Sequence, residues 1–530
     1  MIYVKIIAAL AAVLVLALAY GLSSWLNKEY RNTERVFRVS KKDAIEGLKE
    51  KYIAMIAVIV LLFCAIGFLL SWVTAALFVC GALFSVVAVF VGTRAAVNGS
   101  AITVNAAASG GMNKALKTAF RSGAVMGLCA SGAVILGIGV TVAIIGEVPV
   151  FTAVTGLGLG ASTTALFHCG ADATGRGYDL LDSYAGAIVS AIVLSYAVTE
   201  VVPGFGDGFT LDTTVGVDFA LIITAAGAIG SMAGIIIVRG GENANPASSI
   251  NTGLYVSGAI VILAALIASK NFFGTFNCAF AVIGGLIVGA AASKAFAARA
   301  SEGFRPVWSM IFLVLGTAIA EAAAGIYGVA LSAVGLLSAS AMATASFTYG
   351  AISCDAGGSA EAVPLEENAG LTVGRLLTAG ERAAEEGKGF TVIASGFTAL
   401  ALFLAFSQVS GLMAIDVLHP LVIIGALAGA ALPFLYSAII MNLSKRAAII
   451  GPALIAVIFP LAIGFALGGE ALGGMILGSV VSGTPLAAML TGNKEPAKET
   501  AGLSIRILIK YAAMIAVVFA GLFLRAGDIN

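Results

Sequence analysis

Four ionisable side chains stand close together at the start of an apolar segment. The stretch 170–184 contains Asp172, Arg176, Asp179 and Asp182. On an α helix the spacings i, i+4 and i+7 place the first three on one face, and Asp182 adds a further i+3 step. Ionisable groups at membrane depth are costly and usually functional. This stripe therefore predicts either an aqueous cavity or cationic partners from another segment.

A cationic partner is available near the other end of the chain. Lys510 lies well inside the last apolar segment, with Arg506 one helical turn before it. An aspartate–lysine pair between packed helices would neutralise both charges and stay sensitive to protonation, as an ion gate requires. We therefore assign Asp179, Asp182 and Lys510 to a candidate ion gate. The alternative is a buried structural salt bridge between packed helices.

The composition shows what kind of element must carry these charges. Only 11% of the 530 residues are charged, 60% are hydrophobic, and the mean hydropathy is +1.04. A soluble domain is about a quarter charged, so lipid must cover much of this exterior. The net charge of +1 gives no indication of nucleic-acid binding. The six cysteines are scattered without a CxxC pattern, which argues against a disulfide or metal framework.

Apolar stretches of roughly the ~20 residues that span a bilayer recur along the whole chain. They predict an all-α polytopic membrane protein of about sixteen transmembrane helices, forming one integral membrane domain over residues 1–530. The first stretch is long for a cleaved signal peptide and is read as a retained span. The expected spans are 2–26, 51–73, 75–97, 119–146, 149–167, 176–202, 216–239, 252–269, 276–298, 307–324, 326–348, 389–410, 419–442, 446–467, 470–491 and 502–524.

Lysine and arginine gather on every second connection between these spans, and such connections face the cytoplasm. This alternation predicts a multi-pass protein of the cell (plasma) membrane with both termini outside. Two cytoplasmic connections are unusually polar. Residues 27–50 interleave charges with apolar residues and predict a cytoplasmic amphipathic helix, whereas residues 351–388 are acidic and form the longest cytoplasmic loop.

Six runs of residues, in order along the chain, carry a resemblance to a known family. They are Gly111–Leu128, Asp179–Gly186, Tyr349–Gly358, Gly387–Phe390, Glu470–Gly474 and Leu503–Lys510. Together they resemble the membrane-bound pyrophosphatases, sixteen-helix homodimeric pumps that couple pyrophosphate hydrolysis to export of H⁺ or Na⁺. The resemblance covers nearly the whole chain, although no single run is specific by itself.

The resemblance implies roles for the gate residues. Asp179 matches the gate aspartate of the family's sixth helix, and Lys510 matches the gate lysine of its last helix. Asp182 stands where sodium-pumping members carry a membrane glutamate. A homodimer in the lipid bilayer, with Mg²⁺ as cofactor, is implied in the same way.

Part of a hydrolytic site is also recognisable by resemblance. Asp172 matches a metal-binding aspartate. Glu495 and Glu499 stand where the family has two aspartates before its last helix, and Lys498 keeps the family's lysine. With Asp355 of the third quoted run, Tyr349–Gly358, they make up a residual metal and phosphate site.

Other parts of that site are missing from the sequence. The family's long cytoplasmic extension between helices five and six is absent, because Phe167 passes almost directly into Asp172, and only Thr491–Pro496 precedes the last helix. Binding pyrophosphate with several Mg²⁺ ions needs many carboxylates and lysines. Arg176 and Arg506 add fixed charges that could substitute for missing cations, whereas an arginine beside Mg²⁺ raises the cost of binding metal. The resemblance therefore predicts a shortened homologue with a depleted hydrolytic site.

Three functions stay open at this point. The first is translocation of H⁺ or Na⁺ with pyrophosphate hydrolysis lost or altered, which also leaves pyrophosphate binding in question. The second is a working pyrophosphate-energised proton or sodium pump with a minimal site that uses Glu495 and Glu499. The third is a non-transporting membrane scaffold. Whether the chain is an enzyme depends on which of these holds.

Overall fold

The computed structural model describes most of the chain, namely residues 2–33, 42–145, 150–168, 173–197, 213–239, 245–298, 303–361, 367–412, 415–442, 447–492 and 495–527. Within these ranges the chain forms α helices and no strand. The helices are α1 (Ile2–Asn32), α2 (Lys42–Leu69), α3 (Trp72–Ile144), α4 (Val150–Leu166), α5 (Ala173–Ala197), α6 (Thr213–Ile237), α7 (Pro246–Phe273), α8 (Asn277–Ala297), α9 (Arg305–Ser338), α10 (Ser340–Glu361), α11 (Glu367–Val409), α12 (Pro420–Asn442), α13 (Ala447–Leu490) and α14 (Pro496–Gly527).

Twelve helical stretches of the described residues are long and apolar enough to cross a membrane. The prediction of an all-α polytopic membrane protein is therefore confirmed. The number sixteen stays a prediction. The twelve stretches count α13 once, although it contains most of the expected spans 446–467 and 470–491. They also count α9 once, although the expected spans 307–324 and 326–348 both lie at least partly in it. They also leave out α4, with 17 residues, and α2, whose described apolar part is the short Ile53–Leu69.

Three of the long helices are interrupted by a glycine with a positive φ. Gly111 in α3, Gly325 in α9 and Gly468 in α13 have φ of 66°, 60° and 86°. Glycine adopts this region without steric cost because it has no Cβ. In α3 the two arms fold back on each other, since Gly92 of the first arm packs directly against Met126 of the second. Helix α3 therefore consists of two arms, each long and apolar enough to cross a membrane.

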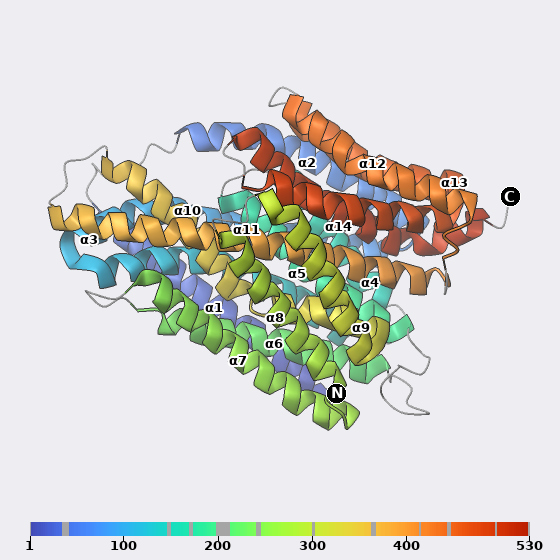
Figure 1. Cartoon of the computed structure of the whole chain (residues 1–530), viewed down its shortest axis with the longest axis horizontal. Coiled ribbons are helices and arrows are strands. Elements are labelled where there is room, and N and C mark those ends of the chain that lie inside the picture. The colour runs from blue at the N-terminus through green and yellow to red at the C-terminus, as the bar shows by residue number, and fades with distance from the viewer. Residues whose placement is uncertain are drawn as a thin grey trace.

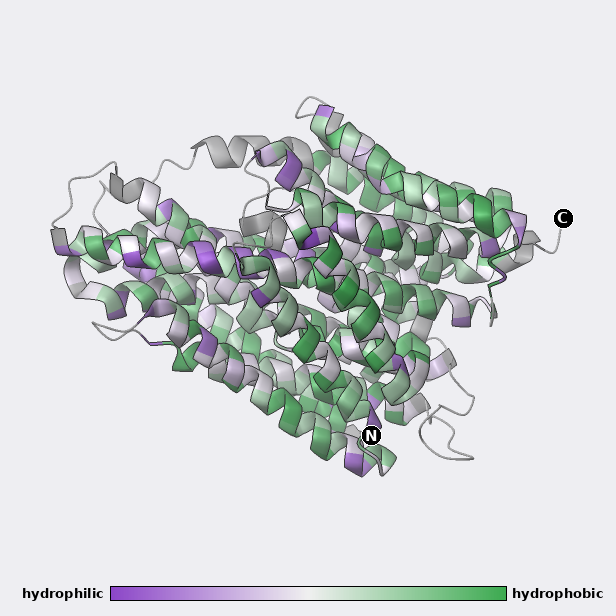
Figure 2. Cartoon of the chain, viewed as in Figure 1, coloured by the Kyte–Doolittle hydropathy of each residue, from purple (hydrophilic) through white to green (hydrophobic). Residues whose placement is uncertain are grey.

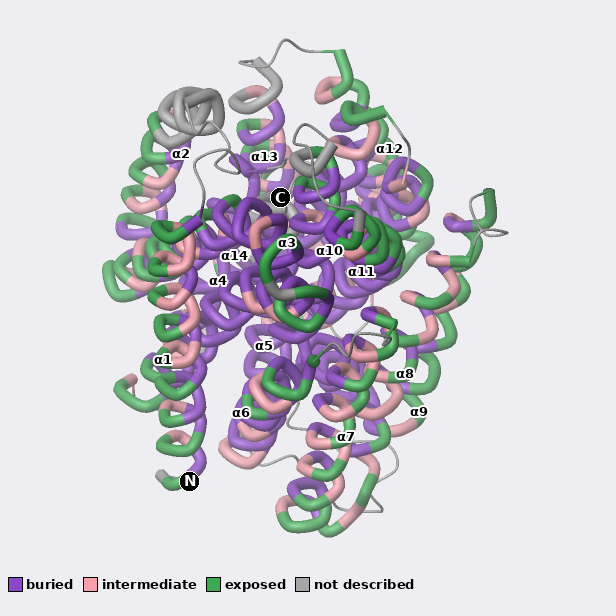
Figure 3. The backbone as a smooth tube through the Cα atoms, turned by 90° about the vertical axis from the view of Figure 1, so that its left-hand side faces the viewer, coloured by how far each residue is buried: buried purple, intermediate pink, exposed green. Residues whose placement is uncertain are grey.

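The helices form an inner group enclosed by an outer one, as Figure 3 shows. In the most apolar 18 residues of α5, within Gly177–Tyr196, every residue is buried, against 28% in the corresponding stretch of α7. The windows of α11 and α14 are 89% buried. Since the apolar parts of α5, α11 and α14 are largely enclosed by other helices, polar groups on these parts face protein and not lipid.

The outward faces of the surrounding helices are apolar, as expected for contact with lipid. Figure 2 shows hydrophobic residues dominating the outer helices α7 and α12. Large side chains such as Leu263 on α7 and Leu427 on α12 are 60% and 67% exposed. These faces would be unstable in water, and they mark the chain as integral to a membrane.

The two polar connections expected from the sequence continue the helices around them. Residues 351–361 prolong α10, and residues 367–388 form the first half of α11. Both extend beyond the body of the molecule at the left-hand end of Figure 1. The acidic connection is thus largely helical. Of residues 27–50, the first part ends α1 and 42–50 begin α2, while 34–41 lie outside the described residues.

Candidate functional site

Lys510 of α14 bridges the two buried aspartates of α5. Its Nζ lies 2.8 Å from Asp179 Oδ1 and 2.8 Å from Asp182 Oδ2. It also donates to the backbone carbonyl of Asp179 at 2.9 Å and to the hydroxyl of Ser183 at 2.7 Å. An ammonium group has only three hydrogens, so four acceptors share them. The structure thus brings the three residues of the expected gate together.

Arg506 joins this cluster from one helical turn earlier in α14. Its Nε lies 3.2 Å from Asp179 Oδ2, and its Nη1 donates to the Thr391 hydroxyl of α11 at 2.6 Å. Asp179 therefore has a cation at each carboxylate oxygen: Lys510 at Oδ1 and Arg506 at Oδ2. Arg506 was expected to replace a missing cation of a metal cavity, and here it forms an ion pair with Asp179, a residue of the expected gate.

Hydroxyl groups complete the surroundings of the two carboxylates. Ser162 of α4 donates to Asp182 Oδ1, and Ser395 of α11 donates to Asp179 Oδ1 at 3.3 Å. Ser183 donates to the backbone carbonyl of Asp179 at 2.8 Å. The sequence analysis did not single out these hydroxyls. Serine and threonine are frequent in these helices, and their roles follow only from which helices pack together.

We refer to Asp179, Asp182, Arg506 and Lys510 as the four-charge cluster. These side chains are 0%, 1%, 3% and 1% exposed. Two acids and two bases balance each other, so the cluster carries no net charge when all four groups are ionised. Removing charges from water costs several kcal/mol per ion, which only close pairing and additional hydrogen bonds offset. Ion pairs between the two acids and the two bases therefore offset the cost of burying these charges.

Helix geometry explains how residues far apart in sequence meet here. Asp179, Asp182 and Ser183 have spacings of i, i+3 and i+4 and share one face of α5. Arg506 and Lys510 have a spacing of i, i+4 and share one face of α14. Both helices belong to the buried inner group (Figure 3), so the two faces are directed into the bundle and not into lipid.

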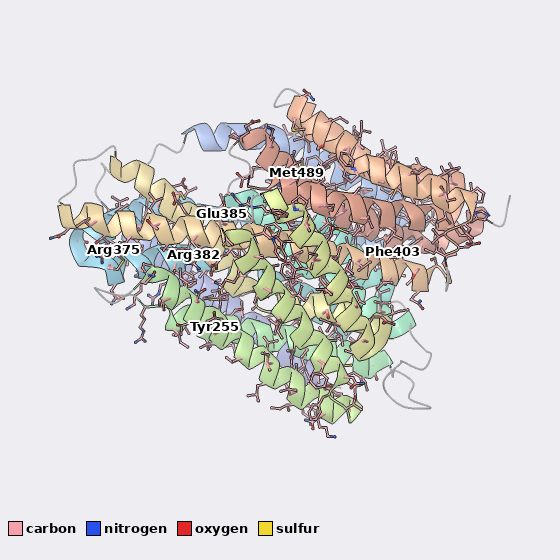
Figure 4. The ribbon with its side chains drawn as sticks, viewed as in Figure 1. Tyr255, Arg375, Arg382, Glu385, Phe403 and Met489 are labelled. Carbon is pink, nitrogen blue, oxygen red and sulfur yellow. The ribbon has the colours of Figure 1, made fainter. Side chains whose placement is uncertain are left out.

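A second group of charges lies around the middle of α11, in a region that the sequence analysis did not assign to a site. Glu385 Oε2 is 2.8 Å from Arg305 Nη2 of α9, and Glu385 Oε1 is 2.7 Å from Lys388 Nζ. Lys388 lies 3.6 Å from Glu499 of α14. Figure 4 shows Glu385 on α11, with Arg382 and Arg375 further toward the end of the molecule. The whole α11 network consists of Lys294, Arg305, Arg382, Glu385, Glu386, Lys388 and Glu499.

Those residues of the expected metal and phosphate site that the structure describes do not gather as a group of three or more metal-binding side chains. Asp355 of α10 is exposed. Glu495 forms an ion pair with Lys498 at 2.9 Å, while Glu499 belongs to the α11 network. Asp172 lies outside the described residues. Arg176 is part of α5, but its side chain is likewise outside the described set.

The described carboxylates do not fit a magnesium–diphosphate centre. Mg²⁺ demands octahedral oxygen ligands and is usually held through carboxylates together with substrate phosphates. Across the described residues, no three His, Cys, Asp or Glu side chains gather as a metal-binding group. Glu385, Glu495 and Glu499 are each paired with a lysine or an arginine. No metal-dependent step is therefore derived from these residues.

The fold and the four-charge cluster define a class, the polytopic membrane proteins that hold ionisable groups at the centre of a helix bundle. Comparison with known proteins makes the assignment specific. Residues 13–171 and 300–450 match the family model described as inorganic H⁺ pyrophosphatase. This match covers more than half of the chain, and the chain belongs to that family.

Individual relatives align over almost their whole length. The chain is 29% identical over 673 positions to a putative K⁺-stimulated pyrophosphate-energised sodium pump of Clostridium tetani, with 98% of both chains covered. It is 25% identical to a K⁺-insensitive pyrophosphate-energised proton pump of Moorella thermoacetica, covering 97% of this chain and 98% of the relative. A K⁺-stimulated pyrophosphate-energised sodium pump of Thermotoga maritima is 24% identical, with 93% and 95% covered.

The chain is shorter than these relatives. Relatives of about 680 residues align nearly end to end with a chain of 530. Most of the difference in length therefore falls in internal gaps of the alignments. The first segment matched by the family model ends at residue 171, beside the short connection between α4 and α5. The four-charge cluster lies outside both matched segments, in parts of the chain that only the full-length alignments cover.

Proposed function

We propose that this protein moves H⁺ or Na⁺ across the membrane through the four-charge cluster, and that its coupling to pyrophosphate hydrolysis is lost or altered. Membership of a family of ion pumps supports the first part. The observation that carries it is Lys510, which bridges Asp179 and Asp182 inside the fully buried α5–α14 contact. Ionisable groups in such a position are expensive and usually mark an ion path.

The second part rests on two features of the chain. The internal gaps shorten it relative to its relatives, and one expected gap adjoins the connection between α4 and α5. In addition, the described carboxylates at the α11 end of the molecule are paired with basic side chains instead of forming a metal-binding group. We propose that this chain keeps the ion gate of the family and has lost part of the site that binds and hydrolyses pyrophosphate.

Ion flux into vesicles that contain the purified full chain tests the proposed path. We expect Asp179→Asn and Lys510→Met to reduce H⁺ or Na⁺ flux by about tenfold or more, because each removes a charge of the gate. Glu321→Gln is the matched control, since Glu321 is an exposed acid on α9 outside the cluster. Unchanged flux in both gate variants would remove the proposed path and favour a scaffold that keeps only the fold.

The alternative of a working pyrophosphate-energised pump is favoured by the names of the relatives and by their near-complete coverage. Such a pump would use Glu495, Lys498 and Glu499 as a minimal site. It predicts Mg²⁺-dependent release of phosphate from pyrophosphate by the purified protein, with loss of that release in Glu499→Gln. Our proposal expects no release above the level of a protein-free control.

A further inference from the structure

Asp179 and Asp182 have different kinds of cationic partner. Asp179 contacts Arg506 through Oδ2 and Lys510 through Oδ1. Asp182 contacts Lys510 through Oδ2 and accepts the Ser162 hydroxyl at Oδ1. A guanidinium is always protonated in proteins, whereas a buried lysine can lose its proton. Lys510 is the only charged partner that the described residues provide for Asp182.

We propose that the ion carried by this cluster is H⁺ and not Na⁺, with Asp182 and Lys510 as the proton-carrying pair and Arg506 as a fixed counter-ion for Asp179. This inference rests on the proposed function, because it names the ion that the path would carry. It runs against the resemblance, in which Asp182 stands where sodium-pumping members carry a membrane glutamate.

Proton transfer within the pair conserves charge. The N–H bond of the Lys510 ammonium breaks, an O–H bond forms at Asp182 Oδ2 across the 2.8 Å contact, and a neutral amine and a neutral carboxylic acid result. Asp179 stays ionised through this step, because Arg506 still neutralises it. Without Arg506, the same step would leave Asp179 as an unpaired buried charge, which is costly. Arg506 therefore lowers the free-energy cost of deprotonating Lys510.

Sodium faces the opposite situation. Each of the four carboxylate oxygens already has a cation or a hydroxyl at it: Lys510 and Arg506 on Asp179, and Ser162 and Lys510 on Asp182. A sodium ion would have to displace the Lys510 and Ser162 donors at the two Oδ1 atoms, or lie next to the cations that already face the two Oδ2 atoms. It would also add a positive charge to a cluster that is already balanced, in a site with almost no access to water.

The titratable groups that act on Asp182 come from two helices. Asp179 lies on its own helix, α5, and Lys510 and Tyr511 lie on α14. From α4 it meets the hydroxyl of Ser162, and the neighbouring Thr163 lies 3.4 Å from the Tyr511 hydroxyl. Lys510 is the only cationic group in this set and lies 2.8 Å from Asp182 Oδ2, so we assign it as the group that exchanges a proton with Asp182.

Two measurements on the full chain test this assignment. In vesicles with an imposed pH gradient and a clamped membrane potential, we expect H⁺ flux that does not change when sodium is replaced by choline. Uptake of radioactive sodium should stay at the level of protein-free vesicles. Asp182→Asn should lower the H⁺ flux by about tenfold or more, and Glu321→Gln should not change it.

A binding measurement gives a second readout that needs no flux. A ligand that binds only the folded state raises its melting temperature. In detergent we expect the same Tm in sodium chloride and in choline chloride of equal ionic strength. Arg506→Gln leaves the cluster with one uncompensated negative charge, so this variant should gain a sodium-specific rise in Tm. Arg506→Lys keeps the charge and should behave like the wild type.

The outcomes separate the two proposals. Sodium uptake by the wild type, or a sodium-specific rise in its Tm that disappears in Asp182→Asn, would overturn the assignment of H⁺ while leaving the proposed path in place. If neither ion moves through the wild-type protein, the proposed function and this inference both fail. If Arg506→Gln does not fold, the wild-type and Asp182→Asn measurements still decide.

Discussion

Lys510 is the residue on which the buried cluster depends. It is the only charged partner of Asp182 among the described residues, whereas Asp179 also has Arg506. The two aspartates are therefore unequal even though both touch the same lysine. This inequality gives a stability prediction that differs between them.

We expect Lys510→Met to destabilise the protein by about 3–5 kcal/mol, because removing one partner of a buried ion pair leaves an uncompensated charge. Adding Asp182→Asn should recover about 1–2 kcal/mol, since it removes that charge. Adding Asp179→Asn instead should recover less, because it deprives Arg506 of its carboxylate. Denaturant unfolding in mixed micelles measures all four proteins. Equal recovery by both second substitutions would contradict the pairing described here.

The sequence predicted part of this cluster and not the rest. Acids and bases in an apolar segment are rare enough to be noticed, and helical spacing placed Asp179 with Asp182 and Arg506 with Lys510. The contact between Arg506 and Asp179 could not be derived, because spacing within one helix does not fix its rotation against another. Ser162 and Ser395 carry no sequence signal for the same reason.

At the scale of the elements, α12 and the second arm of α13 show how glycines bring the helices together. Gly425 and Gly429 of α12 lie against the backbone carbonyls of Ala471 and Met475. On α13, Gly474 and Gly478 lie in the same way against carbonyls of α12. Small residues at i, i+4 on both helices allow backbones to approach closely in a membrane.

We expect Gly429→Leu to destabilise the protein by about 1–3 kcal/mol, because a Cβ at this position would overlap the carbonyl oxygen of Met475. Gly258→Leu on α7 is the matched control, since nothing lies within 4 Å of its Cβ position. Its effect should stay within about 0.5 kcal/mol. Melting temperatures in detergent compare the two. A similar loss in both variants would mean that backbone approach does not limit this contact.

The elements also show where a hydropathy pattern stops being informative. Apolar stretches predicted the helices, and the expected boundaries between 307–324 and 326–348 and between 446–467 and 470–491 coincide with the breaks at Gly325 and Gly468. Hydropathy did not locate the break at Gly111, which lies inside the expected connection between 75–97 and 119–146. The polar residues 351–361 and 367–388 prolong α10 and α11. Backbone hydrogen bonds within a helix form in water as well as in lipid. Polarity excluded these residues from the membrane without excluding a helix.

At the scale of the whole molecule, helices α11 and α14 each contact or contribute to both the four-charge cluster and the α11 network. Thr391 and Ser395 of α11 contact the four-charge cluster, while Glu385 and Lys388 lie in the network. Glu499 and Arg506 link α14 to both in the same way. In the α11 network, basic side chains pair with the carboxylates.

Ion movement in vesicles with and without magnesium pyrophosphate tests the central claim most directly. The account predicts that ions move only down an imposed gradient through the full-length protein, that Lys510→Met stops this movement, and that pyrophosphate changes neither the rate nor the direction. Ion accumulation against a gradient on addition of magnesium pyrophosphate would contradict it, because the hydrolytic site would then be intact and coupled to the gate.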